Sequence, residues 1–204
     1  MAAYAAVVLA GGAARRMGGR DKPALPVAGR PMRDRVLAAV ADAAPRVLVG
    51  PAPALADVLS TREQPPGGGP VAAAAAGLAL LPPGTTTVAL LAADLPLLTR
   101  EAIGALLEAA GPGSAPDGPI PDGACFLDDD GRRQPLCGVW RVAPLRAALD
   151  RIAGRRGGTL DGAAMRELLS ELAVREVAWR GAGPPPWFDC DTDSDVRRAE
   201  EWTR

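Results

Sequence analysis

Hydrophobic residues in this chain form short continuous runs that alternate with segments of helical spacing. The runs at residues 4–10, 46–50 and 86–92 are typical of strands that are buried on both faces. The segment 31–44 places apolar residues at helical spacing after an initial proline, and the segment 70–81 is rich in alanine, so both predict helices. Strands and helices that alternate in this way predict parallel βαβ units and an open α/β sheet.

After residue 98 the pattern predicts a less regular order of helices and strands. A proline- and glycine-rich stretch at residues 111–123 is the best internal boundary, and we interpret it as a loop between two halves of one domain. An acidic turn at residues 128–131 separates two runs whose pattern predicts a hairpin. The elements expected here are helices at 99–110, 144–152, 161–172 and 193–202, hairpin strands at 124–127 and 134–142, and a strand at 174–179.

The ends of the first three predicted strands carry residues that suit a ligand site. Gly11 and Gly12 follow the first strand, Gly50 follows the second, and Asp94 follows the third. Because ligands in open α/β sheets bind at the carboxyl ends of the strands, we expect the site at this edge. A carboxylate in the position of Asp94 suits Mg²⁺, which prefers one or two carboxylates together with phosphate oxygens and water.

Composition removes several classes of function. The chain has 204 residues, 48% of them hydrophobic, and a formal net charge of −1, so there is no basic field that would attract nucleic acid or a membrane surface. The chain contains no histidine, which excludes histidine-dependent nucleophile triads and histidine general bases. Three scattered cysteines and an apolar start without a basic leader favour a cytoplasmic protein without structural disulfides.

The segment at residues 9–22 reads LAGGAARRMGGRDK and combines glycines with cations. Glycines let backbone amides approach a phosphate without a Cβ atom in the way. Three arginines and Lys22 supply the positive charge that a nucleoside triphosphate requires. The segment differs from a P-loop, because Pro23 follows Lys22, and from the G-x-G-x-x-G fingerprint. Lys22 is the one lysine among 23 basic residues, which favours a specific need for a lysine there.

This segment resembles the signature of the MobA-like family of nucleotidyltransferases, which includes the molybdenum cofactor guanylyltransferases. Further similarities follow in the family's order at residues 67–72, 91–96 and 134–136, and at Asp191 before the last helix. The resemblance implies an α/β fold with a Rossmann-like open, mostly parallel sheet and helices on both faces. It also implies a single domain over residues 1–204, with a nucleotide-binding half at 1–110 and an acceptor-binding half at 111–204.

Roles for individual residues follow from the resemblance. Catalysis is expected from Arg16, Lys22 and Asp94, which neutralise charge on the α-phosphate and on the departing pyrophosphate or hold the metal. A Mg²⁺ ion is expected on Asp94 and Asp191. The nucleotide-binding residues expected are Leu9, Ala10, Gly11, Gly12, Lys22 and Asp94.

The resemblance implies transfer of GMP from GTP to the phosphate of molybdopterin, with release of pyrophosphate. Molybdoenzymes or proteins of cofactor biosynthesis are then the expected protein partners. Asp189 and Asp191 stand where guanylyltransferases often carry asparagines and resemble the cytidylyltransferase branch. Two alternatives therefore stay open. One is transfer of CMP or another nucleotide to molybdopterin or a sugar phosphate, and the other is a nucleotide-binding accessory protein without turnover.

Recognition of the base is the least defined part of the prediction. The positions that match base contacts of the family hold Pro66 and Gly50, with Glu63 and Gln64 nearby, so backbone groups are expected to contact the base. The Arg155-Arg156-Gly157-Gly158 stretch suits either an anionic acceptor or a solvated turn. Trp187 is a candidate for stacking on the acceptor.

Overall fold

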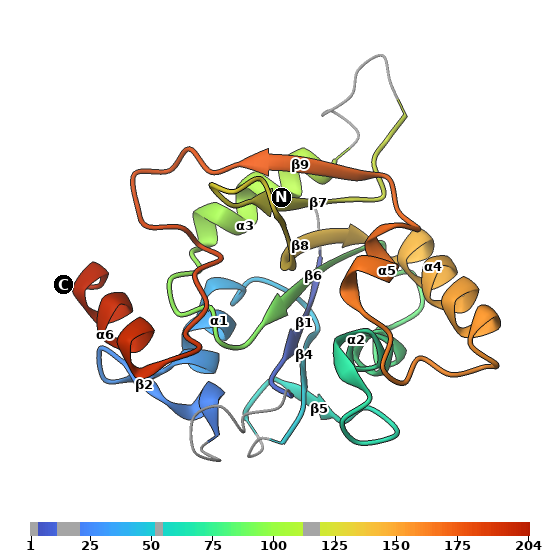
Figure 1. Cartoon of the computed structure of the whole chain (residues 1–204), viewed down its shortest axis with the longest axis horizontal. Helices are drawn as coiled ribbons and strands as arrows, with labels where there is room; N and C mark the ends of the chain where they lie inside the picture. The colour runs from blue at the N-terminus through green and yellow to red at the C-terminus, as the bar shows by residue number, and fades with distance from the viewer. Residues whose placement is uncertain (1–3, 12–20, 52–54, 112–118) are drawn as a thin grey trace.

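A seven-stranded sheet in the order β5-β4-β1-β6-β8-β7-β9 forms the centre of the molecule (Figure 1). The computed structural model describes residues 4–11, 21–51, 55–111 and 119–204. Within this sheet β8 runs antiparallel to its neighbours, and the other pairings are parallel. The open, mostly parallel sheet expected from the sequence is thus confirmed. The strands are β1 (Ala5–Leu9), β4 (Arg46–Val49), β5 (Leu59–Thr61), β6 (Thr87–Ala92), β7 (Gly123–Leu127), β8 (Arg133–Arg141) and β9 (Val174–Ala178).

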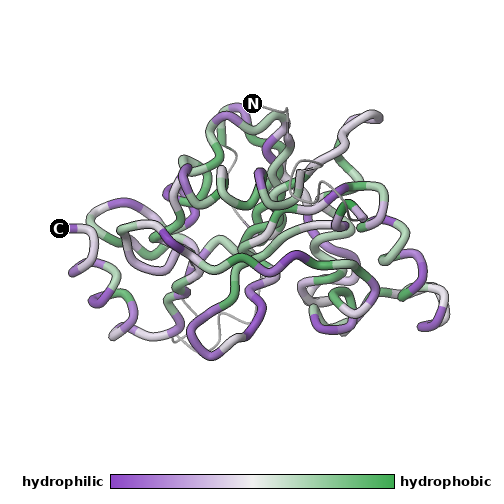
Figure 2. The backbone as a smooth tube through the Cα atoms, turned by 90° about the horizontal axis from the view of Figure 1, so that it is seen from above, coloured by the Kyte–Doolittle hydropathy of each residue, from purple (hydrophilic) through white to green (hydrophobic). Residues whose placement is uncertain are grey.

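Helices cover both faces of the sheet, and each face has its own hydrophobic core. Residues of α1 and α3 pack on one face, and residues of α2, α4 and α5 pack on the other. Hydrophobic stretches run through the middle of the molecule in Figure 2, whereas the outer turns are mostly hydrophilic. The helices are α1 (Met32–Ala39), α2 (Gly69–Ala79), α3 (Arg100–Ala110), α4 (Val142–Arg155), α5 (Met165–Leu169) and α6 (Asp193–Trp202).

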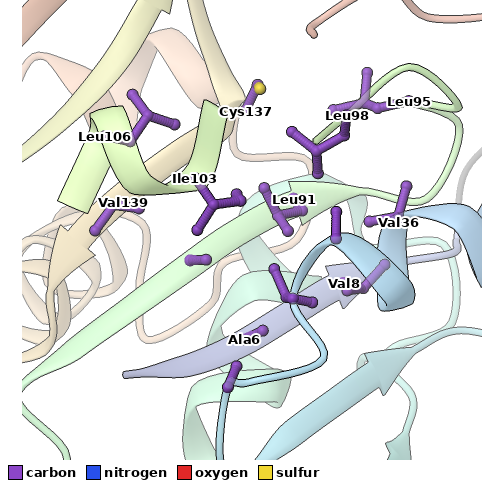
Figure 3. Close-up of a cluster of buried hydrophobic side chains, with 14 of the residues drawn as sticks. Ala6, Val8, Val36, Leu91, Leu95, Leu98, Ile103, Leu106, Cys137 and Val139 are labelled. Atoms are coloured by element: carbon purple, nitrogen blue, oxygen red, sulfur yellow. The ribbon is translucent and has the colours of Figure 1, made fainter. Parts of the chain in front are cut away.

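The side chains of β1 alternate between the two cores, as the pleat of a strand requires. Ala6 and Val8 point to the core under α1 and α3, together with Leu91 of β6, and Figure 3 shows this face. Ile103 and Leu106 of α3 close the same core from above. Burial of each leucine or isoleucine here contributes about 1.5–3 kcal/mol relative to exposure.

Small residues bring α2 close to the sheet on the other face. A Cβ atom on Gly77 would lie 2.4 Å from Cγ1 of Val7 in β1 and 3.0 Å from Cγ2 of Val49 in β4. The alanines that precede Gly77 in the helix are mostly buried against the same core. The alanine-rich sequence therefore sets the distance between helix and sheet, and it holds the first turn of α2 beside the carboxyl ends of β1 and β4.

A polar cluster closes the other end of β1. The hydroxyl of Tyr4 donates to Asp42 Oδ1 at 2.7 Å, and Arg100 Nη2 lies 2.7 Å from Asp42 Oδ2. Burial and the carboxylate of Asp42 together raise the pKa of Tyr4 far above its ordinary value. The contacts join the start of β1, the turn after α1 and the first residue of α3.

The local expectations differ from the structure at three places. The helix expected over 31–44 is α1, which ends at Ala39. A helix was expected over 161–172, but α5 begins only at Met165. Gly162 has φ +67° and donates its N–H to the carbonyl of Gly68, a distant contact that prevents an earlier helix start. The short strand β5 is largely exposed, and its apolar pattern did not indicate it.

The cysteines and the lengths of the helices complete the description of the fold. All three cysteines are buried and unpaired. Across the described ranges, no helix has both the length and the apolar character needed to cross a bilayer.

Candidate active site

Three charged side chains from distant parts of the chain meet at the carboxyl edge of the sheet. Lys22 Nζ lies 2.5 Å from Asp94 Oδ2 and 2.7 Å from Asp191 Oδ1. Lys22 opens the short 3₁₀-helix η2 (Lys22–Ala24), Asp94 follows β6, and Asp191 precedes α6. The lysine side chain is 13% exposed and Asp191 is 52% exposed, so the cluster is open to solvent on the Asp191 side.

The sheet topology explains why these residues meet. β1 lies between β4 and β6, so the chain leaves the carboxyl end of β1 at the point where successive strands are added on opposite sides. Crevices at such points are the usual ligand sites of open α/β sheets. The N–H of Ala93 donates to the carbonyl of Leu9, and the N–H of Cys190 donates to the carbonyl of Asp94. These bonds hold the Asp94 and Asp191 segments beside the end of β1.

A small third core packs together the segments that carry the cluster, and we call it the satellite core. Each charged residue has a neighbour in the chain that is buried in this core: Val27 follows Lys22, Leu97 follows Asp94, and Cys190 precedes Asp191. One residue each of α1 and α6 completes it. The charged ends are thus fixed by apolar burial of their own neighbours in the chain. Its buried members are Val27, Met32, Leu97, Cys190 and Ala199.

The cluster carries an excess of negative charge. Burial would lower the pKa of Lys22, but attraction by Asp94 and the hydrogen bonds from Lys22 to both carboxylates outweigh it and raise this pKa. Partial burial, Asp191 and Asp94 raise the pKa of Asp189, because a third carboxylate is being brought close to two others. One ammonium among three carboxylates leaves a site that favours further positive charge.

The residues fit a Mg²⁺ ion only with help from a substrate. In the parts of the chain that the structure describes, no group of three or more acidic or cysteine side chains is arranged to hold a metal ion. Asp94 and Asp191 do converge, since one oxygen of each contacts the same Nζ atom. Two carboxylates completed by phosphate oxygens and water are a typical set of ligands for Mg²⁺.

A further carboxylate, that of Glu63, lies next to Gly11. Glu63 Oε1 accepts a hydrogen bond of 3.0 Å from the N–H of Gly67 in the turn before α2. A Cβ atom on Gly11 would lie 3.6 Å from the same oxygen, so Glu63 lies next to the end of β1. The sequence placed Glu63 near the expected base contacts but assigned that contact to backbone groups. Its place beside Gly11 results from packing between distant segments, so no local sequence signal could have selected it.

Gly50 brings the ends of β4 and β1 together. It has φ +135°, and a Cβ atom there would lie 2.7 Å from both the carbonyl carbon of Ala10 and the amide nitrogen of Gly11. The N–H of Gly50 donates to the carbonyl of Thr61 in β5. No side chain fits at this position, so the chain after β4 and the chain after β1 approach each other through backbone alone.

The other predicted nucleotide-binding residues differ in their exposure to solvent. Leu9 and Ala10 are buried at the end of β1, and the N–H of Ala10 donates to Val49 in β4. Gly11 is exposed. Gly12 and Arg16 lie outside the described residues.

The two candidate acceptor sites have partners within the protein. Arg155 pairs with Glu171 at 2.6 Å, and Arg156 donates to the carbonyl of Asp161 at 2.8 Å. Both arginines of this stretch therefore bind groups in the segment that follows them. The ring of Trp187 packs on Phe126 with centroids 5.2 Å apart, while the side chain stays partly exposed. Trp187 therefore keeps an exposed part for a ligand, whereas both arginines are paired within the protein.

The sheet order and the charged cluster together define an α/β protein of the nucleotidyltransferase type. The chain belongs to the family of MobA-like NTP transferase domains, whose sequence model matches residues 6–175. The match ends before Asp189, Asp191 and α6, so the structure rather than the family match brings Asp191 to Lys22.

Solved structures of other proteins share this fold. The molybdopterin-guanine dinucleotide biosynthesis protein A from Archaeoglobus fulgidus is 20% identical, with a TM-score of 0.68 over 96% of each chain. The 2-C-methyl-D-erythritol 4-phosphate cytidylyltransferase from Thermus thermophilus is also 20% identical, with a TM-score of 0.66 over 98% of each chain. No curated protein sequence matches the chain. At these identities the likeness establishes the fold alone.

Proposed function

We propose that this protein transfers GMP from GTP to the terminal phosphate of molybdopterin and releases pyrophosphate. The observation that carries the proposal is the convergence of Lys22, Asp94 and Asp191 at the carboxyl edge of the sheet, where Ala93 bonds to the last residue of β1. A compact cationic group between acidic residues at this edge suits a nucleotide whose phosphates arrive with a divalent cation.

The chemistry needs no histidine. The acceptor phosphate is already an anion, so its oxygen attacks the α-phosphorus directly, and the bond between the α-phosphorus and the bridging oxygen breaks as pyrophosphate leaves. Lys22 donates to phosphate oxygens and neutralises charge that develops during transfer. Backbone groups around Gly11 orient the nucleotide, and the predicted contribution of Arg16 is a second cation at the phosphates. A Mg²⁺ ion held by Asp94 and Asp191 would supply Lewis-acid stabilisation of the phosphate oxygens.

Glu63 supports guanine as the base. Guanine presents two adjacent donors, N1–H and the N2 amino group, which a carboxylate can accept together. Cytosine and adenine present an amino group beside an acceptor nitrogen, which would face the carboxylate unfavourably. The proposal therefore assigns Glu63, next to Gly11 and the turn before α2, to the base.

Transfer of CMP is the second candidate. Asp189 and Asp191 favour it, because the cytidylyltransferase branch carries aspartates there, and the Thermus enzyme has a similar fold. In both cases residues 1–110 would bind the nucleotide and 111–204 the acceptor, with Asp191 of the second half completing the cluster on Lys22. The protein would work in the cytoplasm and pass its product to molybdoenzymes or other proteins of cofactor biosynthesis.

Pyrophosphate release with Mg²⁺ and molybdopterin, run in parallel with GTP, CTP and ATP, tests the proposal. Release with GTP supports guanylyl transfer, and release with CTP alone moves the protein to the second candidate. Nucleotide binding without release from any of the three would favour a binding protein or another acceptor. Glu63→Gln should lower the preference for GTP by about 100-fold, since its amide would face guanine donors with a donor. Glu101→Gln, an exposed position in the first turn of α3, is the matched control.

A further inference from the structure

Arg33 is an arginine in the second position of α1 whose side chain is only 11% exposed. Charged side chains are rarely buried to this degree unless they are paired. Its guanidinium faces two carboxylates. Nη1 lies 3.2 Å from Asp21 Oδ2, and Nε lies 3.5 Å from Asp34 Oδ1.

Asp21 immediately precedes Lys22 and belongs to the same turn. The carbonyl of Asp21 accepts from the N–H of Ala24, and the carbonyl of Lys22 accepts from the N–H of Leu25. The carbonyl of Leu25 accepts in turn from the N–H of Met32, the first residue of α1. The turn that carries Lys22 is thus tied to α1 at both ends, by the Arg33–Asp21 pair and by the Leu25–Met32 backbone bond.

We propose that Arg33 is a positioning residue that acts through Asp21 to fix the backbone from which Lys22 reaches Asp94 and Asp191. The inference rests on the function proposed for Lys22. A lysine side chain has four rotatable bonds, so the place of its ammonium depends on a fixed Cα atom as well as on the carboxylates. Misplacement of a catalytic group by about 1 Å can cost about 100-fold in rate.

Because Lys22 is the one lysine of the chain, an NMR experiment with ¹³C-labelled lysine observes it alone. In the native protein the two Hε protons of Lys22 should have separate shifts, because the side chain is held in one place. In Arg33→Gln and in Asp21→Asn they should merge toward the single shift of a mobile lysine. Unchanged, separate Hε shifts in Arg33→Gln would overturn the inference without reference to any acceptor.

Arg100→Gln is the matched control, because Arg100 also forms an ion pair between a helix start and a distant aspartate, at the other end of β1. It should leave the Lys22 signals unchanged. If it alters them as much as Arg33→Gln does, the effect is general loosening and the inference fails.

Kinetics give an independent arm once the acceptor and nucleotide are established. Arg33→Gln should lower kcat by about 10- to 100-fold with little change in KM for the nucleotide. Combined with Lys22→Ala it should cause no further loss, because Arg33 acts only through Lys22. Additive losses would show a separate structural role and overturn the inference. Absence of transfer in the native protein would instead reject the proposed function, while the NMR result on Arg33 would still stand.

Discussion

The two ends of β1 carry polar clusters of opposite character. At its start, one carboxylate, Asp42, is shared by a phenol and a guanidinium. At its carboxyl end, one ammonium, Lys22, is shared by Asp94 and Asp191 with a third carboxylate close by. Both clusters join three segments of the chain, yet only the first balances its charges internally.

The difference separates a cluster that serves the fold from one suited to a ligand. A shared carboxylate with matched donors stabilises the native state without further partners. An excess of carboxylates around one lysine costs stability, and such costs are tolerated mainly at functional sites. The satellite core holds this unfavourable arrangement in place.

Loss of the lysine should have the largest effect on activity. Lys22→Ala should lower transfer by at least about 100- to 1,000-fold, as expected when a preorganised donor to developing charge is removed. Asp94→Ala should have a comparable effect. Pyrophosphate release measures both, and circular dichroism should show an intact fold. Turnover near that of the native protein in either variant would remove the residue from the mechanism.

The tight approach between β4 and β1 should dominate the effects on stability. Gly50→Ala should lower the free energy of unfolding by about 2–4 kcal/mol, because a Cβ atom would strike the backbone of Ala10 and Gly11 at a positive φ. Gly29→Ala is the matched control, since Gly29 has φ +75° but no atom within 4 Å of its Cβ position. It should cost only about 1 kcal/mol. Urea unfolding measures both variants. An equal decrease in the free energy of unfolding of the two would contradict the role of the close contact at Gly50.

A change in the Tyr4–Asp42–Arg100 cluster should alter the stability of the protein and leave its activity unchanged. Tyr4→Phe removes the hydroxyl that donates to Asp42 and should cost about 0.5–1.5 kcal/mol in urea unfolding. Transfer activity should stay within about twofold of the native value, since Tyr4 lies at the end of β1 away from Gly11. A large loss of kcat would mean that the two ends of β1 are coupled.

The smallest effect concerns the third carboxylate and depends on pH. Because the pKa of Asp189 is raised in the folded protein, its ionisation opposes folding at pH values above the folded pKa. Asp189→Asn should therefore raise the midpoint of thermal unfolding slightly at pH 7 without metal. The gain should shrink as the pH falls through the folded pKa and vanish below the ordinary aspartate pKa of about 3.9, where the carboxyl is protonated in the folded and the unfolded chain. A gain that is constant from pH 7 to pH 4 would assign the effect to packing instead.

Local patterns predicted the sheet and most helices, and contacts between distant segments explain the rest. The apolar runs predicted β1, β4 and β6, and the helices expected at 99–110 and 193–202 are α3 and α6. The hydroxyl of Thr99 caps α3 by accepting from the N–H of Ala102, and Thr192 and Asp195 form a capping box at α6. The start of α5 depends on a bond from Gly162 to Gly68, which periodicity cannot reveal.

The candidate site was predictable in its residue types but not in its pairing. Lys22, Asp94 and Asp191 were selected by motif and strand position, whereas the direct contact of the lysine with both carboxylates was not expected. Glu63 was noted for its position, and only the packing of the turn before α2 against β1 places it beside Gly11. The burial of Arg33 could not be predicted from the sequence, because an arginine in an amphipathic helix is usually solvated.

The contact between Lys22 and Asp191 spans 169 residues of chain, and this separation has a consequence for folding. Closing so long a loop is entropically costly until the sheet between the two residues has formed. The segment from Phe188 through α6 should therefore dock after the sheet, and it should be able to open while the sheet stays folded. Backbone amides of α6 would then exchange with solvent faster than those of β1 and β6, so the complete charged cluster forms last and is lost first.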